Sequence, residues 1–393
     1  MIVDINHMMK RSGNMGVNNK KWVIYLMSLL IGVTMGILNP MVSTHITFNN
    51  VSEIWVGILA SGYFFFIALA SVIVGRFLIN KDLKKLIIFG LALSAVCTAL
   101  FPFVSGVLLW FILYSLTGVG IGFYMIGSQT ILHKFADEKS LGVVSGIYTM
   151  NFAIGTLVGV VIGSILYGIH ESVPFLMTSV ALVLASLLLA TQVKGSLVMP
   201  GFQGKNVLGK IKLALVGVCA YAIVEAVLVS LYPSYLIRYD YSTAEMGLAV
   251  GMFIIGTIIG TLPFSHLADK MGREKALIIS GFVAIVGLIG VMTIEVFYLK
   301  LLVSFIAGFG IGPIYPISMA LTTQNLKLDE LQSGTAMFIF FYGIGSTIGP
   351  VLSSMTMVTI NGSHVFTLSL ALFIILVVSA FARAAKSNVP LAK

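Results

Sequence analysis

The chain has 393 residues, of which 58% are hydrophobic and only 9% are charged, and its formal net charge is +9. Soluble globular proteins carry about 25% charged residues. The composition therefore excludes a water-soluble fold of this length, and with it most enzymes, nucleic-acid binders and disordered proteins. One membrane span takes about 20 apolar residues, so the chain has room for twelve spans and for no sizeable domain outside the membrane.

The apolar runs predict an all-α integral membrane protein with twelve transmembrane helices. In chain order we expect these helices at residues 22–44, 54–79, 86–104, 107–132, 141–167, 173–193, 211–237, 244–265, 276–295, 298–323, 333–359 and 363–383. The polar, basic segment before the first run lacks the hydrophobic core of a cleavable signal peptide. We therefore expect the first run to remain as a helix.

The basic residues predict how the helices are oriented. If the N-terminus is cytoplasmic, all 23 lysines and arginines except Arg238 and Lys300 fall on the cytoplasmic side. Cytoplasmic loops of membrane proteins carry an excess of these residues. We therefore expect both termini to be cytoplasmic.

The longest cytoplasmic connection divides the spans into two sets of six. This connection, residues 194–210, contains Pro200 and several glycines. We expect a cytoplasmic tail, an N-terminal six-helix bundle, a cytoplasmic linker, a C-terminal six-helix bundle and a second cytoplasmic tail, at residues 1–21, 22–193, 194–210, 211–383 and 384–393.

The two sets repeat in one constant register, so that positions in spans two to five have counterparts in spans eight to eleven. Without a gap, the run Gly118, Gly120, Ile121, Gly122 maps onto Gly308, Gly310, Ile311, Gly312. Because each set has an even number of spans, both sets enter the membrane in the same direction. The pattern predicts two pseudo-symmetric parallel repeats, related by an axis along the membrane normal, with a substrate path between them.

A charged loop motif joins spans eight and nine. Residues 265–275 read SHLADKMGREK, which fits the pattern G-x-x-x-D-[RK]-x-G-[RK]-x-[RK] except at its first position. Gly272 permits a tight turn, and Asp269 can accept hydrogen bonds from helix N-terminal amides or pair with a cation. The corresponding loop between spans two and three, residues 75–85, is degenerate, with Ile79 in place of the aspartate.

Small residues recur along spans five and eleven. Span five carries Gly146, Gly155, Gly159 and Gly163, and span eleven carries the related run Gly345, Gly349 and Pro350. Small residues at this spacing let membrane helices approach closely.

These motifs, together with the repeat, resemble the major facilitator superfamily over essentially the whole chain. The resemblance implies a cytoplasmic latch between the two halves at Asp269, Gly272 and Arg273. The span-five glycines are similar to the pattern that the family associates with antiporters, although Val160 replaces its proline. The second half looks like a bacterial drug-efflux-like branch, which implies a bacterial cytoplasmic (inner) membrane. In span four, Tyr114 stands where many proton-coupled members carry an arginine.

Glu225 is the one acidic residue that falls deep inside a predicted span. It lies midway between Lys212 and Arg238, near the two ends of its span, which places it close to the bilayer midplane. A carboxylate at that depth costs several kcal/mol unless it is paired, protonated or in a water-filled cavity. We therefore predict that Glu225 carries protons or binds a cationic substrate, and the alternative is a protonated, hydrogen-bonded structural glutamate.

Other polar residues in the spans are candidates to line a substrate cavity: Asn39, Gln129, Asn151, Tyr221, Tyr232 and Tyr315. Each is as well suited to hydrogen bonding between helices as to substrate contact. In span ten, Pro313 and Pro316 are expected to break the helical ladder and orient Tyr315.

The sequence predicts a secondary active transporter that exports a small amphipathic or cationic compound (a drug, a metabolite or a metallophore) by proton antiport with alternating access. We expect no catalytic residues, no cofactor and no metal site. The expected partners of this monomer are the substrate, protons and membrane lipid, and no nucleic acid. A proton-coupled importer or facilitator of a polar small molecule is an open alternative, as is a lipid scramblase or a non-transporting receptor.

Overall fold

The computed structural model describes residues 21–77, 83–135, 141–193, 207–324, 326–327 and 330–387, and within these ranges the regular structure is helical. The helices are α2 (Lys21–Phe48), α3 (Glu53–Phe77), α4 (Leu83–Leu100), η1 (Phe101–Phe103), α5 (Val107–Phe135), α6 (Leu141–Ile169), α7 (Val173–Gln192), η2 (Leu208–Lys210), α8 (Lys212–Arg238), α9 (Thr243–Met271), α10 (Arg273–Thr293), α11 (Phe297–Ile311), α12 (Ile314–Gln324), α13 (Leu331–Thr359), η4 (Gly362–Phe366) and α14 (Thr367–Ser387).

Twelve spans in the described part of the chain are long and apolar enough to cross a membrane. Their ends agree with the predicted ends to within a few residues, except in the eighth span, and the predicted end of the second span, residue 79, lies outside the described residues. We expected that span to end at residue 265, but α9 continues to Met271 and stops at Gly272, which has a φ of 95°. Glycine adopts this left-handed conformation without steric cost, so the turn sits at the glycine rather than where the apolar run ends.

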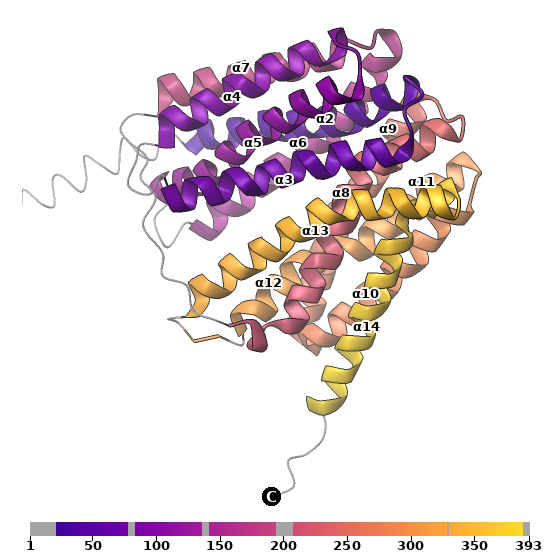
Figure 1. The fold of residues 1–393 in the computed structure, drawn as a ribbon. Coiled ribbons are helices and arrows are strands. Elements are labelled where there is room, and N and C mark those ends of the chain that lie inside the picture. The colour runs from indigo at the N-terminus through magenta and orange to yellow at the C-terminus, as the bar shows by residue number, and fades with distance from the viewer. Residues whose placement is uncertain are drawn as a thin grey trace, which may run out of the picture.

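The spans form two sets of six, α2–α7 and α8–α14, and the sequence repeat is also a repeat in space (Figure 1). A Cβ atom on Gly118 of α5 would lie 2.5 Å from the backbone oxygen of Tyr63 in α3. One on Gly308 of α11 would lie 2.0 Å from the backbone oxygen of Phe253 in α9. Tyr63 and Phe253 are counterparts in the same register that pairs Gly118 with Gly308, so the predicted pseudo-symmetry is confirmed at equivalent helix crossings.

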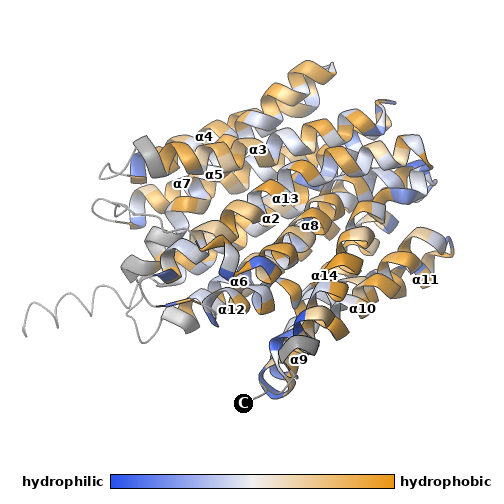
Figure 2. Cartoon of the chain, turned by 60° about the horizontal axis from the view of Figure 1, so that its bottom comes forward, coloured by the Kyte–Doolittle hydropathy of each residue, from blue (hydrophilic) through white to orange (hydrophobic). Residues whose placement is uncertain are grey.

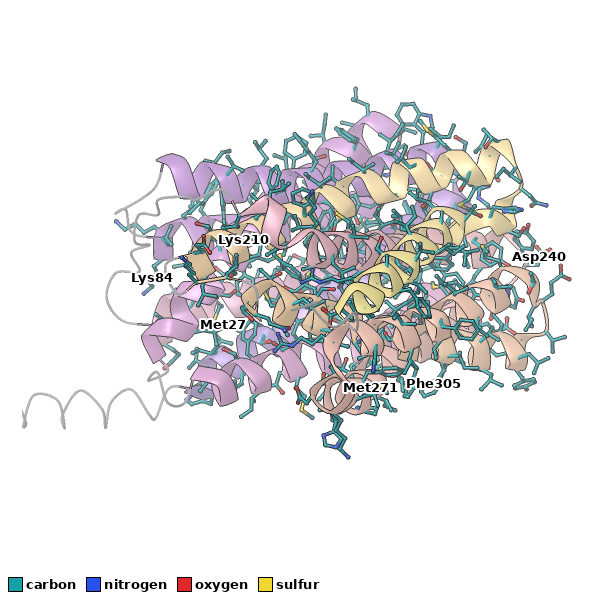
Figure 3. The ribbon with its side chains drawn as sticks, turned by 90° about the horizontal axis from the view of Figure 1, so that it is seen from below. Met27, Lys84, Lys210, Asp240, Met271 and Phe305 are labelled. Atoms are coloured by element: carbon teal, nitrogen blue, oxygen red, sulfur yellow. The ribbon has the colours of Figure 1, made fainter. Side chains whose placement is uncertain are left out.

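Two opposite ends of the molecule are marked by charged residues. Figure 3 shows Lys84 and Lys210 at one end and Asp240 at the other. We call the first end the basic end, because Lys84 and Lys210 lie there, and we call the second end the opposite end. Hydrophobic residues cover the sides of the helices in Figure 2. Large apolar side chains such as Leu108 and Leu262 are exposed. Such a surface suits lipid rather than water.

The two halves touch through the helix pairs α3–α13, α6–α9 and α2–α8. Their close approaches lie toward the opposite end: Gly57 of α3 faces Ser354 of α13, and Gly247 of α9 faces Ser164 of α6. In Figure 1, α3 and α13 converge toward the opposite end and diverge toward the basic end. The conformation is therefore one in which the halves are joined at the opposite end.

Candidate functional site

The candidate site is built on Glu225, in the middle of α8. Both of its sequence neighbours, Val224 and Ala226, are buried, whereas Glu225 is half-buried. Its Oε2 accepts a hydrogen bond of 2.6 Å from the hydroxyl of Tyr342 on α13. Among the described residues Glu225 has no ion-pair partner. A carboxylate in the middle of a membrane-spanning helix thus accepts a hydrogen bond from a phenol on a neighbouring helix.

Three tyrosines gather around this carboxylate from three helices. Tyr221 lies one turn before Glu225 on α8, Tyr315 lies on α12, and Tyr342 lies on α13. The ring centroids are 5.3 Å apart for Tyr221 and Tyr315, and 6.0 Å apart for Tyr315 and Tyr342. All three residues are half-buried. We call these four residues the acid–tyrosine site.

A break in the tenth span positions Tyr315. Helix α11 ends at Ile311, and α12 begins at Ile314 after Gly312 and Pro313. Proline has no N–H group and cannot continue the preceding helix without disturbing its hydrogen bonds. Tyr315 therefore lies in the first turn of the new helix α12, where its ring also packs edge-on against Phe338 of α13 at 5.2 Å.

Small residues bring α13 against α8 and so assemble the site. A Cβ atom on Gly345 would lie 2.9 Å from the Cβ of Ala222, and Gly349 lies against Ile223. Gly345 is close to one turn beyond Tyr342, and Ala222 is close to one turn before Glu225. The close approach of the two helices therefore places the phenol beside the carboxylate.

Tyr342 was not among the residues predicted from the sequence. It is 117 positions from Glu225 along the chain, and no motif links the two. The available signal was its position one turn before the small-residue run at Gly345, which marks α13 as a helix that packs closely on a neighbour. That signal does not identify the neighbour.

Two predicted cavity residues lie elsewhere, in hydrogen bonds between helices. Asn39 of α2 is buried, and its Oδ1 accepts a hydrogen bond from the hydroxyl of Tyr114 on α5. Tyr232 of α8 is fully buried, with its hydroxyl 2.8 Å from Oγ of Ser304 on α11. Asn151 is half-buried on α6, in the other half from the acid–tyrosine site. The side chain of Gln129 lies outside the described residues.

The charged loop motif holds the turn between α9 and α10 to α12 of the same half. Asp269 is exposed at the end of α9. Arg273 donates a hydrogen bond to the backbone oxygen of Ala320 and another of 3.0 Å to Oε1 of Gln324. Residues 78–82 of the first copy, which include Ile79, are outside the described ranges.

The glycines of the fifth span divide into two groups. Cβ atoms on Gly155 and Gly159 would lie 2.4 and 2.5 Å from backbone oxygens of α2, and Gly163 faces Ile37 of the same helix. Gly146 is exposed and has nothing within 4 Å of such an atom. In the eleventh span, Pro350 is buried inside α13, with its backbone oxygen near Gly57.

Known proteins are similar in sequence to this chain over most of its length. The family model described as Major Facilitator Superfamily matches residues 24–201 and 213–392. The chain is 25% identical over 342 residues to the uncharacterized MFS-type transporter YcaD of Escherichia fergusonii, covering 84% of this chain and 86% of that one. It is 24% identical over 361 residues to the uncharacterized MFS-type transporter YfkF of Bacillus subtilis, covering 88% and 90%.

The fold is also similar to solved structures at low sequence identity. A bacterial homolog of the human lysosomal transporter Spinster, in an inward-facing and unoccupied conformation, matches with a TM-score of 0.73 and 13% identity, over 93% of this chain and 96% of that one. A mutant of the nucleoside transporter NupG matches with a TM-score of 0.76 and 13% identity, over 92% and 99%. These likenesses establish the arrangement of the helices.

Proposed function

Because the chain belongs to the major facilitator superfamily and is a multi-pass secondary transporter, we propose that it exports a small amphipathic or cationic compound in exchange for protons. The basic end is cytoplasmic in this proposal, since lysine and arginine gather on the cytoplasmic side of membrane proteins. The observation that carries the proposal is the carboxylate of Glu225, which accepts a hydrogen bond from Tyr342 and lies among tyrosine rings.

The position of Glu225 makes proton exchange its natural chemistry. A membrane-embedded carboxylate without a cationic partner is costly while it is ionised. Either a proton or a bound cation removes that cost, and the carboxylate accommodates only one of the two at a time. Binding of a cation therefore releases the proton, and binding of the proton releases the cation, which is the coupling that an antiporter needs.

The tyrosines favour an organic cation with apolar surface. The face of an aromatic ring attracts a cation, and the same ring gives apolar contact to the rest of the molecule. Tyr221, Tyr315 and Tyr342 supply such rings beside a single carboxylate. We therefore expect the substrate to carry one positive charge on an apolar body, as many drugs and metabolites do.

The proposal is tested by reconstituting the protein in vesicles that contain a pH-sensitive dye. A panel of cationic dyes, metallophores and polar nutrients is added to wild type, to Glu225→Gln and to Asp240→Asn. Asp240 is exposed at the opposite end and has a φ of 62°, a conformation that asparagine tolerates, so this variant controls for the loss of one carboxylate.

We expect a cationic compound to drive proton movement in wild type and Asp240→Asn but not in Glu225→Gln. The direction of coupled flux distinguishes an exporter from an importer. Movement of the compound without protons in wild type would contradict the antiport proposal, and so would proton movement that Glu225→Gln leaves intact.

A further inference from the structure

A polar seam joins the two halves at the opposite end, where α2 meets α8. Ser43 of α2 donates a buried hydrogen bond to the backbone oxygen of Ser230. One turn further along both helices, Oγ1 of Thr47 lies 2.8 Å from Oγ of Ser234. Both pairs are separated by 187 residues, so the contacts repeat along one face of each helix.

Arg238 adds an ion pair and a further hydrogen bond to this seam. One further turn along α8, its guanidinium donates to the backbone oxygen of Val51, again 187 residues away. Its Nε lies 3.2 Å from Oε1 of Glu53 in α3, and both side chains are half-buried. Arg238 is one of two basic residues that the sequence places away from the cytoplasmic side. Its position is explained by a carboxylate and a carbonyl in the other half.

One helix of this seam, α8, is also a helix of the acid–tyrosine site. Helix α8 carries both Glu225 and Arg238, and α13 carries Tyr342. At its far end α13 is seated on α3, where the backbone N–H of Val351 donates a hydrogen bond of 3.1 Å to Oγ of Ser61. Both helices that hold the carboxylate and its phenol donor therefore also contact the first half.

We propose that these contacts form a latch, separate from the cytoplasmic loop motif, that holds the opposite end closed and that must release before this end can open. The latch consists of Ser43, Thr47, Val51 and Glu53 from the first half and Ser230, Ser234 and Arg238 from the second. Half-buried ion pairs contribute modestly to stability, and separated ions at a wet surface are readily hydrated. The latch therefore favours the closed state without making it permanent. This inference rests on the proposed function only in assuming that the two ends open in turn.

Labelling of a buried reporter measures how often the opposite end opens. Ser164→Cys is introduced where α6 meets α9, since Ser164 is fully buried against Gly247 and lies outside the latch. The two native cysteines, Cys97 and Cys219, are first replaced by alanine. A membrane-impermeant maleimide is then added to intact cells, so that labelling requires opening of the opposite end to the outside.

We expect Glu53→Gln to raise the labelling rate of this reporter about twofold to fivefold, the effect of losing an ion pair worth up to about 1 kcal/mol. Arg238→Gln should have an equal or larger effect, because it also removes the hydrogen bond to Val51. Glu274→Gln is the matched control: it breaks an ion pair of 3.4 Å with Arg383 inside the second half and should leave labelling unchanged.

A cross-link tests the same latch in the other direction. Thr47→Cys with Ser234→Cys places two thiols where the hydroxyl oxygens are 2.8 Å apart. Oxidation should stop labelling of the Ser164→Cys reporter, and a reductant should restore it. The proposal is overturned if Glu53→Gln labels no faster than Glu274→Gln, or if the cross-linked protein labels at the uncross-linked rate. Labelling requires no substrate, so failure of the latch is distinguishable from failure of the role proposed for Glu225.

Discussion

Tyr114 and Ser304 occupy equivalent positions in the two halves, in the register that pairs Gly118 with Gly308, and each is hydrogen-bonded to the first helix of its own half. Tyr114 of α5 donates to Asn39 of α2, and Ser304 of α11 pairs with Tyr232 of α8. In the first half the tyrosine lies on the fourth span, α5, whereas in the second half it lies on the first span, α8. The first and fourth spans of each half are thus joined by a hydrogen bond to a tyrosine hydroxyl, but the tyrosine comes from a different one of the two helices.

We expect Tyr114→Phe to lower the free energy of unfolding by about 1–3 kcal/mol, because the buried Oδ1 of Asn39 loses its donor. Thermal unfolding in detergent measures this change. Tyr298→Phe is the control, since Tyr298 is 80% exposed and surface substitutions usually change stability by less than about 0.5 kcal/mol. Equal stability of the two variants would show that the tether contributes nothing.

Lys300 is fully buried near the opposite end, although the sequence indicated only that it lies outside the cytoplasmic side. Its Nζ donates to the hydroxyl of Tyr235 at 2.8 Å and to the backbone oxygen of Val291 at 3.1 Å. Tyr235→Phe keeps the ring but removes the hydroxyl acceptor. We expect a loss of about 1.5–3 kcal/mol, which is typical of a hydrogen bond to a charged group.

A second substitution distinguishes the effect of the lost hydrogen bond from the cost of the buried Lys300 ammonium that remains. Lys300→Met in the Tyr235→Phe background should recover part of the stability, because a buried ammonium that has lost one of its two hydrogen-bond acceptors is more costly than an apolar side chain of similar size. Unfolding of the two single variants and the double variant completes the cycle. Strict additivity of the two effects would contradict the coupling.

Gly159 and Gly146 belong to the same small-residue pattern but should respond differently to alanine. A Cβ atom on Gly159 would lie 2.5 Å from the backbone oxygen of Val33, so Gly159→Ala should cost about 1–3 kcal/mol. Gly146 has open space, and Gly146→Ala should be neutral or gain up to about 1 kcal/mol from helix propensity. Thermal unfolding of both variants tests the contrast, and a loss at Gly146 as large as that at Gly159 would refute it.

The aromatic face of Tyr315 should matter more than its hydroxyl for binding a cation. Tyr315→Leu is expected to weaken binding of a fluorescent quaternary ammonium dye about twofold to thirtyfold, because cation–π attraction is worth about 0.5–2 kcal/mol. Tyr315→Phe keeps the ring and should stay close to wild type. Titration of the purified protein compares the three, and equal weakening by leucine and phenylalanine would rule out the role of the ring.

The number and order of the spans, and most of their ends, followed from the sequence because they depend on a local property. An apolar run long enough to cross the bilayer forms a helix wherever its neighbours lie, since backbone polar groups in lipid must bond within the segment. The repeat was readable for a similar reason, because Gly118 and Gly308 mark helix crossings that tolerate no side chain. Glu225 could be identified as a candidate because it is the one acidic residue that falls deep inside a predicted span.

The partners of these residues were decided only by the tertiary structure. Both faces of a membrane helix are apolar, one toward lipid and one toward protein, so the pattern specifies the rotation of each helix only weakly. Whether Asn39 points to a substrate or to Tyr114 depends on that rotation. The pairing of Tyr342 with Glu225 and of Arg238 with Glu53 depends further on which helices pack together and in what register, and contacts between distant segments set both.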